Sequence, residues 1–258
     1  MKNLDGLICI RDGNKLDYCW RESIASMLPV CDRVVVCIGT GGSDNTEAAA
    51  REMAEKEPKI AICMYDWPNP KGDINFWTDW MNYARSHCRP GNILQLDADE
   101  ILHENSYSDI LHWKSLEGRF SLWCDRANFF KDTKSLVPHG VCLSHRVVRF
   151  LPHDVWIPSD GPDSRGDAAI SMALNSGILI CHYGFLRNPK QYFMKSRALL
   201  GYFFDTYDPR LAEAELLSGN WMEEIQGVEW TKQLIPYTKT HPKIIHEWLK
   251  ERNHDYNI

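Results

Sequence analysis

The sequence predicts an α/β fold: a mostly parallel β-sheet flanked by helices, followed by an antiparallel, less regular half and C-terminal helices. Over roughly the first hundred residues, short runs of apolar and β-branched residues alternate with segments of helical length, as they do in βαβ units. These runs are apolar throughout, which is typical of strands that are covered on both faces. The length of 258 residues, with 44% hydrophobic and 25% charged residues, suits one large domain.

Four strands are predicted in the first half, at residues 5–10, 33–38, 59–65 and 92–96. Helices are predicted between them, at residues 15–28, 46–57 and 74–88. Pro29 ends the first helix and Pro58 follows the second, because proline cannot continue the hydrogen-bond ladder of a helix. The second strand runs into the Gly-rich turn "GTGGSDNT", in which Asp44 or Asn45 is suited to cap the next helix.

The second half of the chain is predicted to be less regular. Its strands are expected at residues 119–130, 144–151 and 177–186. A helix is expected at 188–204, with Pro189 in its first turn, and further helices near 209–217 and 242–252. A long loop rich in Pro, Gly and Asp, "HDVWIPSDGPDSRGD", precedes the last of these strands. The chain changes character near residue 105 without a clear domain boundary.

The net charge of −6 and the pI near 5.9 do not indicate a general polyanion-binding surface. Nine cysteines are present, none of them in a C-x-x-C pair and several within apolar, strand-like runs. An odd number of such cysteines indicates reduced thiols and a cytoplasmic protein. The N-terminal segment lacks the apolar core of a signal peptide, and no apolar run approaches the ~20 residues of a membrane span, which fits the same expectation.

A cluster of acids follows the fourth predicted strand, since Asp97, Asp99 and Glu100 come directly after "NILQL". Residues i and i+2 of a strand share one side, so we expect Asp97 and Asp99 to face a crevice at the carboxyl end of the sheet, where α/β folds bind ligands. Two converging carboxylates repel each other unless they are protonated or neutralised. Mg²⁺ or Mn²⁺, shared with the phosphates of a substrate, would neutralise them; the alternative is a solvated turn.

Three segments in this order carry a resemblance to a known family: "ICIRDGNKLDYCWRESIASMLPVCDRVVVCIGTGGSDNTEAAA", "INFWTDWMNYARS" and "GNILQLDADEIL". They resemble the family 2 glycosyltransferases of the GT-A fold, over roughly residues 5–105. A later "HYG", His182-Tyr183-Gly184, followed by a basic helical segment, looks like one branch of that family. The resemblance implies a Rossmann-like sheet in one continuous domain, with residues 1–105 as the nucleotide-sugar-binding half and 106–258 as the acceptor-binding half.

The resemblance implies a metal-dependent glycosyltransferase. Such an enzyme moves a sugar from a nucleotide-diphosphate sugar to an acceptor hydroxyl and inverts the configuration of the sugar's anomeric carbon. A UDP-sugar is the first candidate donor. The D-x-D motif would hold Mn²⁺ or Mg²⁺ through Asp99, with His182 as a further ligand; the alternative for His182 is a core residue. The residues expected to bind the nucleotide sugar are Arg11, Asp12, Asp44, Asn82, Asp97, Arg187 and Lys195. For Asp12 and Asp44 the alternative is a turn or helix cap, and for the basic residues a solvated helix face.

An inverting transfer needs a general base within hydrogen-bond reach of the acceptor hydroxyl. The long loop that follows the strand predicted at 144–151 offers four acids, Asp154, Asp160, Asp163 and Asp167. By resemblance, Asp160, which follows "VWIPS", is the first candidate and Asp163 the second; an Asp-Gly-Pro turn is the alternative. The acceptor stays unknown. Such proteins act on lipids, polysaccharides, proteins, small molecules and modified nucleic acid, and the charge of this chain does not indicate the last.

The sequence departs from the family pattern at two places. The second predicted strand ends in "GTGG", where the family often has an Asp that contacts the nucleotide base. Met81-Asn82 replaces the family's R-N, so Arg85 and Lys71 are candidates to substitute for the lost arginine. These departures leave open a catalytically inactive protein that binds a sugar or a nucleotide. A nucleotidyltransferase is the other alternative, because it can share the fold and an acid-metal site, although "RDGNKLD" is a poor match to the Gly-rich phosphate loop of that class.

Overall fold

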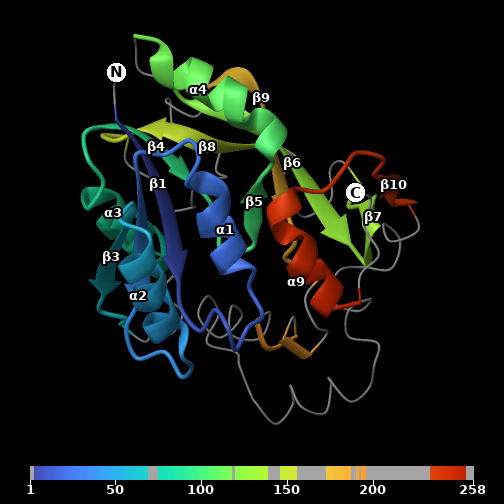
Figure 1. Ribbon diagram of the computed structural model, residues 1–258, viewed down its shortest axis with the longest axis horizontal. Coiled ribbons are helices and arrows are strands. Elements are labelled where there is room, and N and C mark those ends of the chain that lie inside the picture. Colours follow the sequence, from blue (N-terminus) through green and yellow to red (C-terminus); the bar gives the residue numbers. More distant parts are fainter. Residues whose placement is uncertain are drawn as a thin grey trace.

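The computed structural model of the protein (Figure 1) describes residues 3–68, 75–117, 120–138, 146–155, 173–186, 190–191, 193–195 and 233–253. Its central feature is a ten-stranded sheet. The parallel half has the strand order β4-β1-β2-β3. Its members are β1 (Asn3–Ile10), β2 (Arg33–Gly39), β3 (Ile60–Tyr65) and β4 (Gly91–Gln95).

The antiparallel half continues the sheet from β4 in the order β8-β6-β7-β10. Its members are β6 (Leu122–Phe130), β7 (Asp132–Leu136), β8 (Arg146–Pro152) and β10 (Ile235–Pro236). Two further strands lie off this path: β5 (Glu100–Leu102) is antiparallel to β9 (Leu174–His182), and β9 runs parallel to β6. Residues 96–99 connect β4 to β5 and therefore join the parallel half to the β5–β9 pair.

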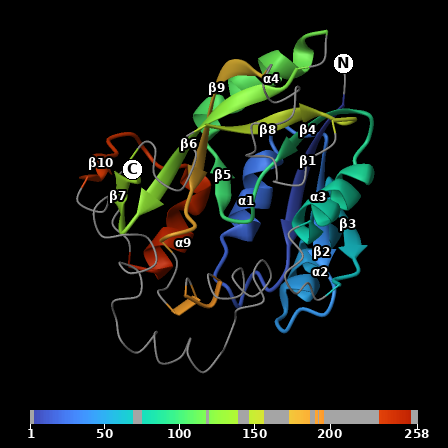
Figure 2. The same ribbon diagram turned by 180° about the vertical axis from the view of Figure 1, so that it is seen from behind.

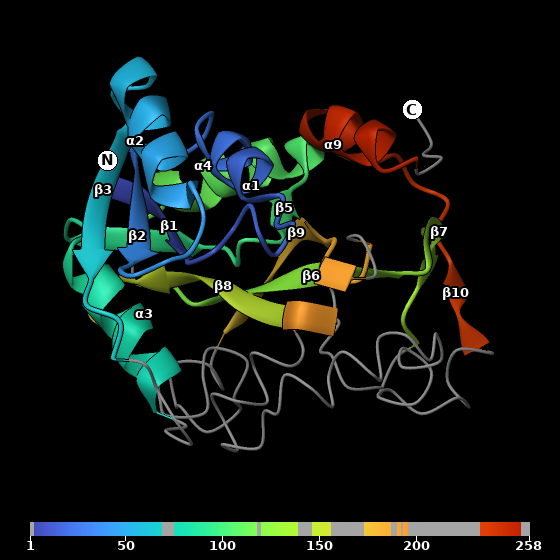
Figure 3. The same ribbon diagram turned by 90° about the horizontal axis from the view of Figure 1, so that it is seen from below.

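Helices cover both faces of the sheet (Figure 3). One face carries α1 (Trp20–Met27), α2 (Thr46–Lys56), α4 (Tyr107–Ser115) and α9 (His246–Glu251). On the opposite face, α3 (Phe76–Ser86) covers the parallel strands, as the view from behind shows (Figure 2). Two 3₁₀ turns, η1 (Glu104–Ser106) and η3 (Lys243–Ile245), precede α4 and α9. Among the helices in the described ranges, none combines the length and the apolar character needed to cross a lipid bilayer.

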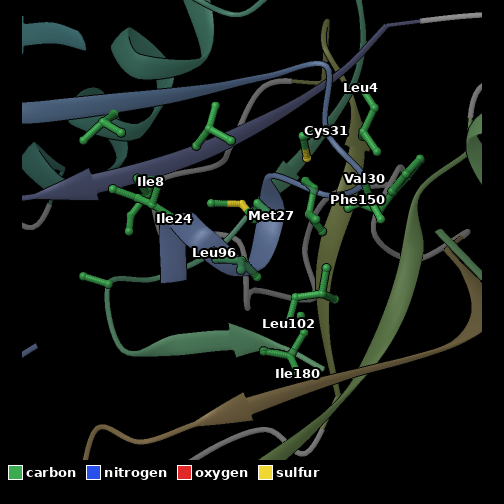
Figure 4. Packing of buried hydrophobic residues seen from close by; sticks show 14 of the residues in the cluster. Leu4, Ile8, Ile24, Met27, Val30, Cys31, Leu96, Leu102, Phe150 and Ile180 are labelled. Carbon is green, nitrogen blue, oxygen red and sulfur yellow. The ribbon is translucent and has the colours of Figure 1, made fainter. Parts of the chain in front are cut away.

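The largest hydrophobic core lies between α1 and the sheet (Figure 4). Ile24 and Met27 of α1 belong to one buried cluster with Leu4 of β1, Leu102 of β5 and Ile180 of β9. Complete burial of an aliphatic side chain of this size contributes about 1.5–3 kcal/mol. The cluster therefore fixes the β5–β9 pair against the parallel half, and it gives the acidic turn that leads into β5 a rigid support.

The predicted strands and helices of the first half are present, and the antiparallel second half is confirmed. The first helix begins at Trp20 instead of residue 15, because Asp17 has a positive φ angle of 56°, which interrupts a right-handed helix. Strand β5 and helix α4 were not predicted, since a three-residue strand is too short to show a period. The predicted helix at 209–217 and most of the one at 188–204 lie outside the described residues.

Eight cysteines lie in the described residues, and each carries a free thiol. Cys9, Cys37 and Cys63 stand side by side in register on β1, β2 and β3. A hydrogen bond with Cys37 and burial raise the pKa of Cys63, and burial raises the pKa of Cys88 to about 12. Thiols in this state are protonated and unreactive at neutral pH, so Cys63 and Cys88 act as core residues.

Candidate functional site

The D-A-D-E segment forms a turn between β4 and β5. β4 ends at Gln95, and the amide of Glu100 donates to the carbonyl of Asp97 over 3.0 Å. The prediction that Asp97 and Asp99 share one side of a strand was therefore wrong in its geometry. The turn still lies at the carboxyl end of β4, where α/β folds bind ligands, and its two aspartates have different surroundings.

Strand register places His182 beside this turn. In the antiparallel β5–β9 pair, Glu100 lies opposite His182. The amide of Tyr183 donates to the carbonyl of Asp99 over 2.8 Å. The "HYG" segment and the acidic turn, which are far apart in the sequence, therefore lie side by side.

Arg149 of β8 supplies the main counter-charge to the turn. It donates from Nη2 to Asp97 Oδ2 (2.7 Å) and from Nε to Glu100 Oε2 (2.8 Å). Arg126 of β6 lies 3.1 Å from Glu100 Oε1. The β6–β8 register skips Arg149, and a β-bulge of this kind re-aims a side chain. The bulge thus explains how an arginine of an interior strand reaches the acids at the end of β4.

Glu100 stays charged although it is fully buried. Burial by itself would raise the pKa of this carboxyl, but the guanidinium groups of Arg149 and Arg126 outweigh burial and lower the pKa to about 2. Glu100 Oε2 also accepts the amide of Asp97 over 3.0 Å. The buried network therefore fixes the backbone of the turn as well as its charges.

Asp99 is surrounded by other groups. Lys195 Nζ donates to its Oδ2 over 2.8 Å, and His182 Nε2 lies 3.6 Å from its Oδ1, beyond ordinary hydrogen-bond distance. Gly184 leaves the space between them open, because a Cβ at this position would lie 2.6 Å from His182 Nε2 and 2.8 Å from Asp99 Oδ2. Asp97 and Glu100 are paired with Arg149, and Asp99 is paired with Lys195, so each of the three carboxylates has a positive partner. The metal ion was predicted because unpaired carboxylates would repel each other, and the chain itself already relieves that repulsion.

His182 has the properties of a metal ligand. Burial lowers its pKa to about 4, so the imidazole is neutral at pH 7, the form that binds metal ions. The nitrogen that faces Asp99 and the space beside Gly184 is Nε2. Nδ1 is buried and has no hydrogen-bond partner among the residues that the structure describes, so these residues do not supply the second hydrogen bond that usually orients a metal-binding imidazole.

The described residues contain no group of three His, Cys, Asp or Glu side chains that could hold a metal ion. Mg²⁺ and similar ions, however, are commonly held by one or two protein ligands together with substrate phosphates and water. Asp99 and His182, with the space that Gly184 leaves, fit a metal ion that is shared with a substrate. They do not form a closed cage that would hold a metal ion by itself.

Gly184→Ala should close the space between Asp99 and His182. Misplacing a metal ligand in this way typically costs 10–100-fold in metal affinity, and we expect a loss of that size in Mn²⁺ binding, measured by calorimetric titration. Gly42→Ala is the control, because a Cβ at Gly42 meets its nearest neighbour, Asp12, at an ordinary 3.4 Å. Parent-like Mn²⁺ affinity in Gly184→Ala would show that the ion binds elsewhere.

The loop between β1 and α1 is tied to the Gly-rich turn after β2 by residues that were predicted to contact the nucleotide. Arg11 donates from Nε to the carbonyl of Thr40 over 3.2 Å and lies over the ring of Trp67 at 4.8 Å. Asp12 Oδ1 accepts the amide of Ser43 over 2.5 Å. These contacts give both residues a structural task in the loops, and their nucleotide contacts remain predictions.

Asp44 connects the same loop to the start of α2. Its carboxylate accepts the amides of Lys15 (2.7 Å) and Thr46 (2.9 Å). Burial would raise the pKa of Asp44, but these amides hold the pKa below its ordinary value. The N-cap position of α2 is occupied by Asn45, which makes no side-chain cap hydrogen bond. Asp44 thus binds the first residue of α2 from just before the cap and joins it to the β1–α1 loop, with one oxygen for each segment.

The other predicted site residues lie elsewhere in the chain. Asn82 is buried on α3. Arg85 is also buried and donates to the carbonyl of Pro152 over 2.8 Å, opposite the start of β4; it therefore cannot substitute for a phosphate-binding arginine at the acidic turn. Asp154 follows β8 and also lies near the start of β4, away from the acidic turn. The predicted residues outside the described ranges are Lys71, Asp160, Asp163, Asp167 and Arg187.

The C-terminal segment supports the site from outside, a contact that sequence reasoning missed. The hydroxyl of Tyr183 donates to His241 Nδ1 over 2.8 Å, and His241 Nε2 donates to the carbonyl of Thr133 over 2.9 Å. Arg252, directly after α9, forms an ion pair with Asp17 of the β1–α1 loop. The tail is therefore bound both to the "HYG" segment and to the loop that precedes α1.

No protein-family profile and no curated protein sequence matches this chain. Its fold matches that of the mannosyltransferase PcManGT from Pyrobaculum calidifontis in complex with GDP-Man and Mn²⁺, with a TM-score of 0.50 and 14% identity over 83% of this chain and 70% of that one. S. aureus TarS 1–349 has a TM-score of 0.44 at 10% identity, over 86% of this chain and 71% of that one. The same fragment in complex with UDP-GlcNAc has a TM-score of 0.42 at 10% identity, over 86% and 72%. The likeness to PcManGT, together with the sheet topology, shows that this chain has the GT-A-like fold that the sequence predicted.

Proposed function

We propose that this chain is a metal-dependent glycosyltransferase. It binds a nucleotide-diphosphate sugar at the carboxyl end of β4 and transfers the sugar to an acceptor hydroxyl. The observation that supports this most is the meeting of Asp99, His182 and Lys195 at that place. A carboxylate, a neutral imidazole and an ammonium group are suited to a diphosphate and its metal ion, and the fold is shared with a mannosyltransferase in complex with GDP-Man and Mn²⁺.

The leaving nucleoside diphosphate carries the charge that the site must stabilise. Asp99 and His182 would hold Mn²⁺ or Mg²⁺, which supplies positive charge to the diphosphate when bound. Lys195 adds a second positive group on the same side, and such preorganised charge lowers the barrier to departure of the leaving group. Asp97 has a side chain that is 36% exposed and is held by Arg149, so it can accept hydrogen bonds from ribose or sugar hydroxyls.

The nucleotide would extend from this turn toward the carboxyl ends of β1 and β2, where Arg11 and Asp12 lie. At the end of β2, the space next to Gly39 is filled by Trp67, since a Cβ on Gly39 would lie 2.8 Å from the Trp67 ring. Trp67 thus lies where the family often has an acidic residue. The sequence makes a UDP-sugar the first candidate donor. GDP-sugars are included in the same binding screen.

Transfer with inversion requires a base on the acceptor side. Asp160 remains our first candidate for this role and Asp163 the second, both from the sequence. Asp154 is a weaker candidate than Asp160 and Asp163. It follows β8, which runs antiparallel to β4, and it therefore lies near the start of β4 and away from the acidic turn at the other end. The acceptor stays open.

The function is tested by screening UDP- and GDP-sugars with Mn²⁺ for thermal stabilisation, followed by slow donor hydrolysis without acceptor. A ligand at one hundred times its Kd should stabilise the fold by about 2.7 kcal/mol, and EDTA should remove most of this. Release of nucleoside diphosphate from the stabilising donor supports a glycosyltransferase. Binding without any hydrolysis or transfer would instead indicate an inactive binding protein, and pyrophosphate release from a nucleoside triphosphate and a sugar phosphate would indicate a nucleotidyltransferase.

A further inference from the structure

The two oxygens of the Asp99 carboxylate face different partners. Oδ2 accepts a hydrogen bond from Lys195 Nζ at 2.8 Å, and Oδ1 faces His182 Nε2 at 3.6 Å. The Lys195 ammonium also lies 5.0 Å from the ring centre of Tyr18 in the β1–α1 loop. One carboxylate is thus offered both to a cation of the chain and to the space beside the imidazole.

Among the described residues, Arg149 and Lys195 contact the aspartates of this turn, and these two cations differ in how firmly they are held. Arg149 is 1% exposed and binds Asp97 and Glu100 together through a rigid guanidinium. Lys195 binds one carboxylate through a flexible stem and has a side chain that is 20% exposed. An ammonium on such a stem can change partners at little cost, whereas a buried two-partner guanidinium cannot. The Tyr18 ring offers the released ammonium a second favourable contact.

A divalent cation and the Lys195 ammonium compete for the Asp99 carboxylate. Both are positive, so they repel at short distance, and each needs the same negative charge. We propose that Lys195 is an exchangeable counter-ion: it neutralises Asp99 when no metal ion is bound, and the ion displaces it toward the diphosphate of the donor. This inference rests on the proposed function for the identity of the diphosphate, but its first half concerns the metal ion alone.

The exchange would make metal and donor binding support each other. Without a donor, the ion must displace Lys195, which weakens its binding. With a donor, the displaced ammonium gains the diphosphate as a new partner, and a hydrogen bond between two charged groups is stronger than one between neutral groups. Metal ion and nucleotide should therefore each bind more tightly in the presence of the other.

The test is a titration of Mn²⁺, without nucleotide, into the full chain and into Lys195→Met, with free Mn²⁺ followed by its paramagnetic resonance signal. We expect Lys195→Met to bind Mn²⁺ about 10-fold more tightly, the size of effect of one hydrogen bond to a charged group. Lys190→Met is the matched control, since Lys190 is exposed and stands five residues before Lys195, and it should bind as the parent does. A misfolded variant would not gain affinity, so a gain cannot be mistaken for unfolding.

The second half is tested by titrating UDP and GDP at saturating Mn²⁺. Lys195→Met should bind the preferred nucleotide about 10-fold more weakly than the parent. Unchanged or weaker Mn²⁺ binding by Lys195→Met, or no Mn²⁺ binding by either protein, would overturn the exchange. Tighter Mn²⁺ binding with unchanged nucleotide affinity would overturn the transfer of Lys195 to the diphosphate. If Mn²⁺ binding responds as expected but no nucleotide or nucleotide sugar binds at all, the proposed function fails while the exchange at Asp99 stands.

Discussion

Replacing Arg149 by Met should lower the free energy of unfolding by about 3–5 kcal/mol at neutral pH, because removing one partner of a buried ion-pair network leaves a buried charge uncompensated. Arg149 is 1% exposed and binds the fully buried Glu100 through two nitrogens. After the substitution, Arg126 is the one arginine among the described residues that still forms an ion pair with that carboxylate. Denaturant unfolding followed by circular dichroism measures the loss. Arg146→Met is the matched control on the same strand. Arg146 lies 3.8 Å from Asp125 and contacts Asn175 and the Trp123 ring, but its side chain is 45% exposed, so we expect a change of at most about 1 kcal/mol.

The pH dependence of this loss identifies Glu100 as its source. In the parent, the folded-state pKa of Glu100 is about 2, below its ordinary value of 4.5. Its contribution to stability is therefore fully present above pH 4.5 and disappears as the pH falls toward 2. The difference between parent and Arg149→Met should shrink over the same interval. A loss below about 1 kcal/mol, or one that does not change in acid, would mean that the network does not support the turn.

Asp160→Asn should reduce sugar transfer by ~10²–10⁴-fold, the usual contribution of a general base, without changing the affinity for the nucleotide sugar. A base acts on the acceptor hydroxyl and not on the donor, so rate and donor binding should separate. Single-turnover transfer and calorimetric donor titration measure the two quantities. Asp154→Asn is the control from the same stretch of chain, because Asp154 follows β8 at the opposite end of β4 from the acidic turn and should leave both quantities unchanged.

The outcome for Asp160 also tests the stereochemistry. Asp163→Asn and Asp167→Asn belong in the same series. If Asp163→Asn loses transfer and Asp160→Asn does not, the base is Asp163 and the inverting mechanism remains. If none of these acids affects the rate, the configuration of the new glycosidic bond, determined by NMR, decides between inversion and retention. A product with retained configuration would contradict the inverting mechanism.

The parallel half of the fold is predictable from the sequence because its physical signal is local. The runs around Val35 and Ile93 are continuously apolar, since α3 and the helices on the other face cover both sides of β2 and β4. Pro29 and Pro58 then mark where the segments after the first and second helices begin. The turn at Asp97 and Asp99 escaped this reasoning because its shape is set by distant partners, Arg149 above all.

The buried arginines of the site left a signal that sequence reasoning can use. Arg149 stands in the middle of the apolar run "RVVRFL", and Arg126 stands in "CDRANFF". A charged residue within a strand that is otherwise buried is rarely found without a partner of opposite charge. Glu100, which follows a buried strand, was the natural partner to look for. The pairing of Glu100 with His182, in contrast, depends on strand register between β5 and β9, and a three-residue strand carries no register signal in the sequence.

The central claim is that the acidic turn binds a nucleotide sugar through a metal ion at Asp99. Its most direct test is calorimetric titration of the donor selected by the screen into the parent and Asp99→Asn, each with Mn²⁺ and with EDTA. The account predicts that Mn²⁺ raises the donor affinity of the parent by at least about 10-fold, and that Asp99→Asn binds weakly and equally in both conditions. Equal donor affinity of the parent with Mn²⁺ and with EDTA, or a Mn²⁺-dependent gain that persists in Asp99→Asn, would contradict it.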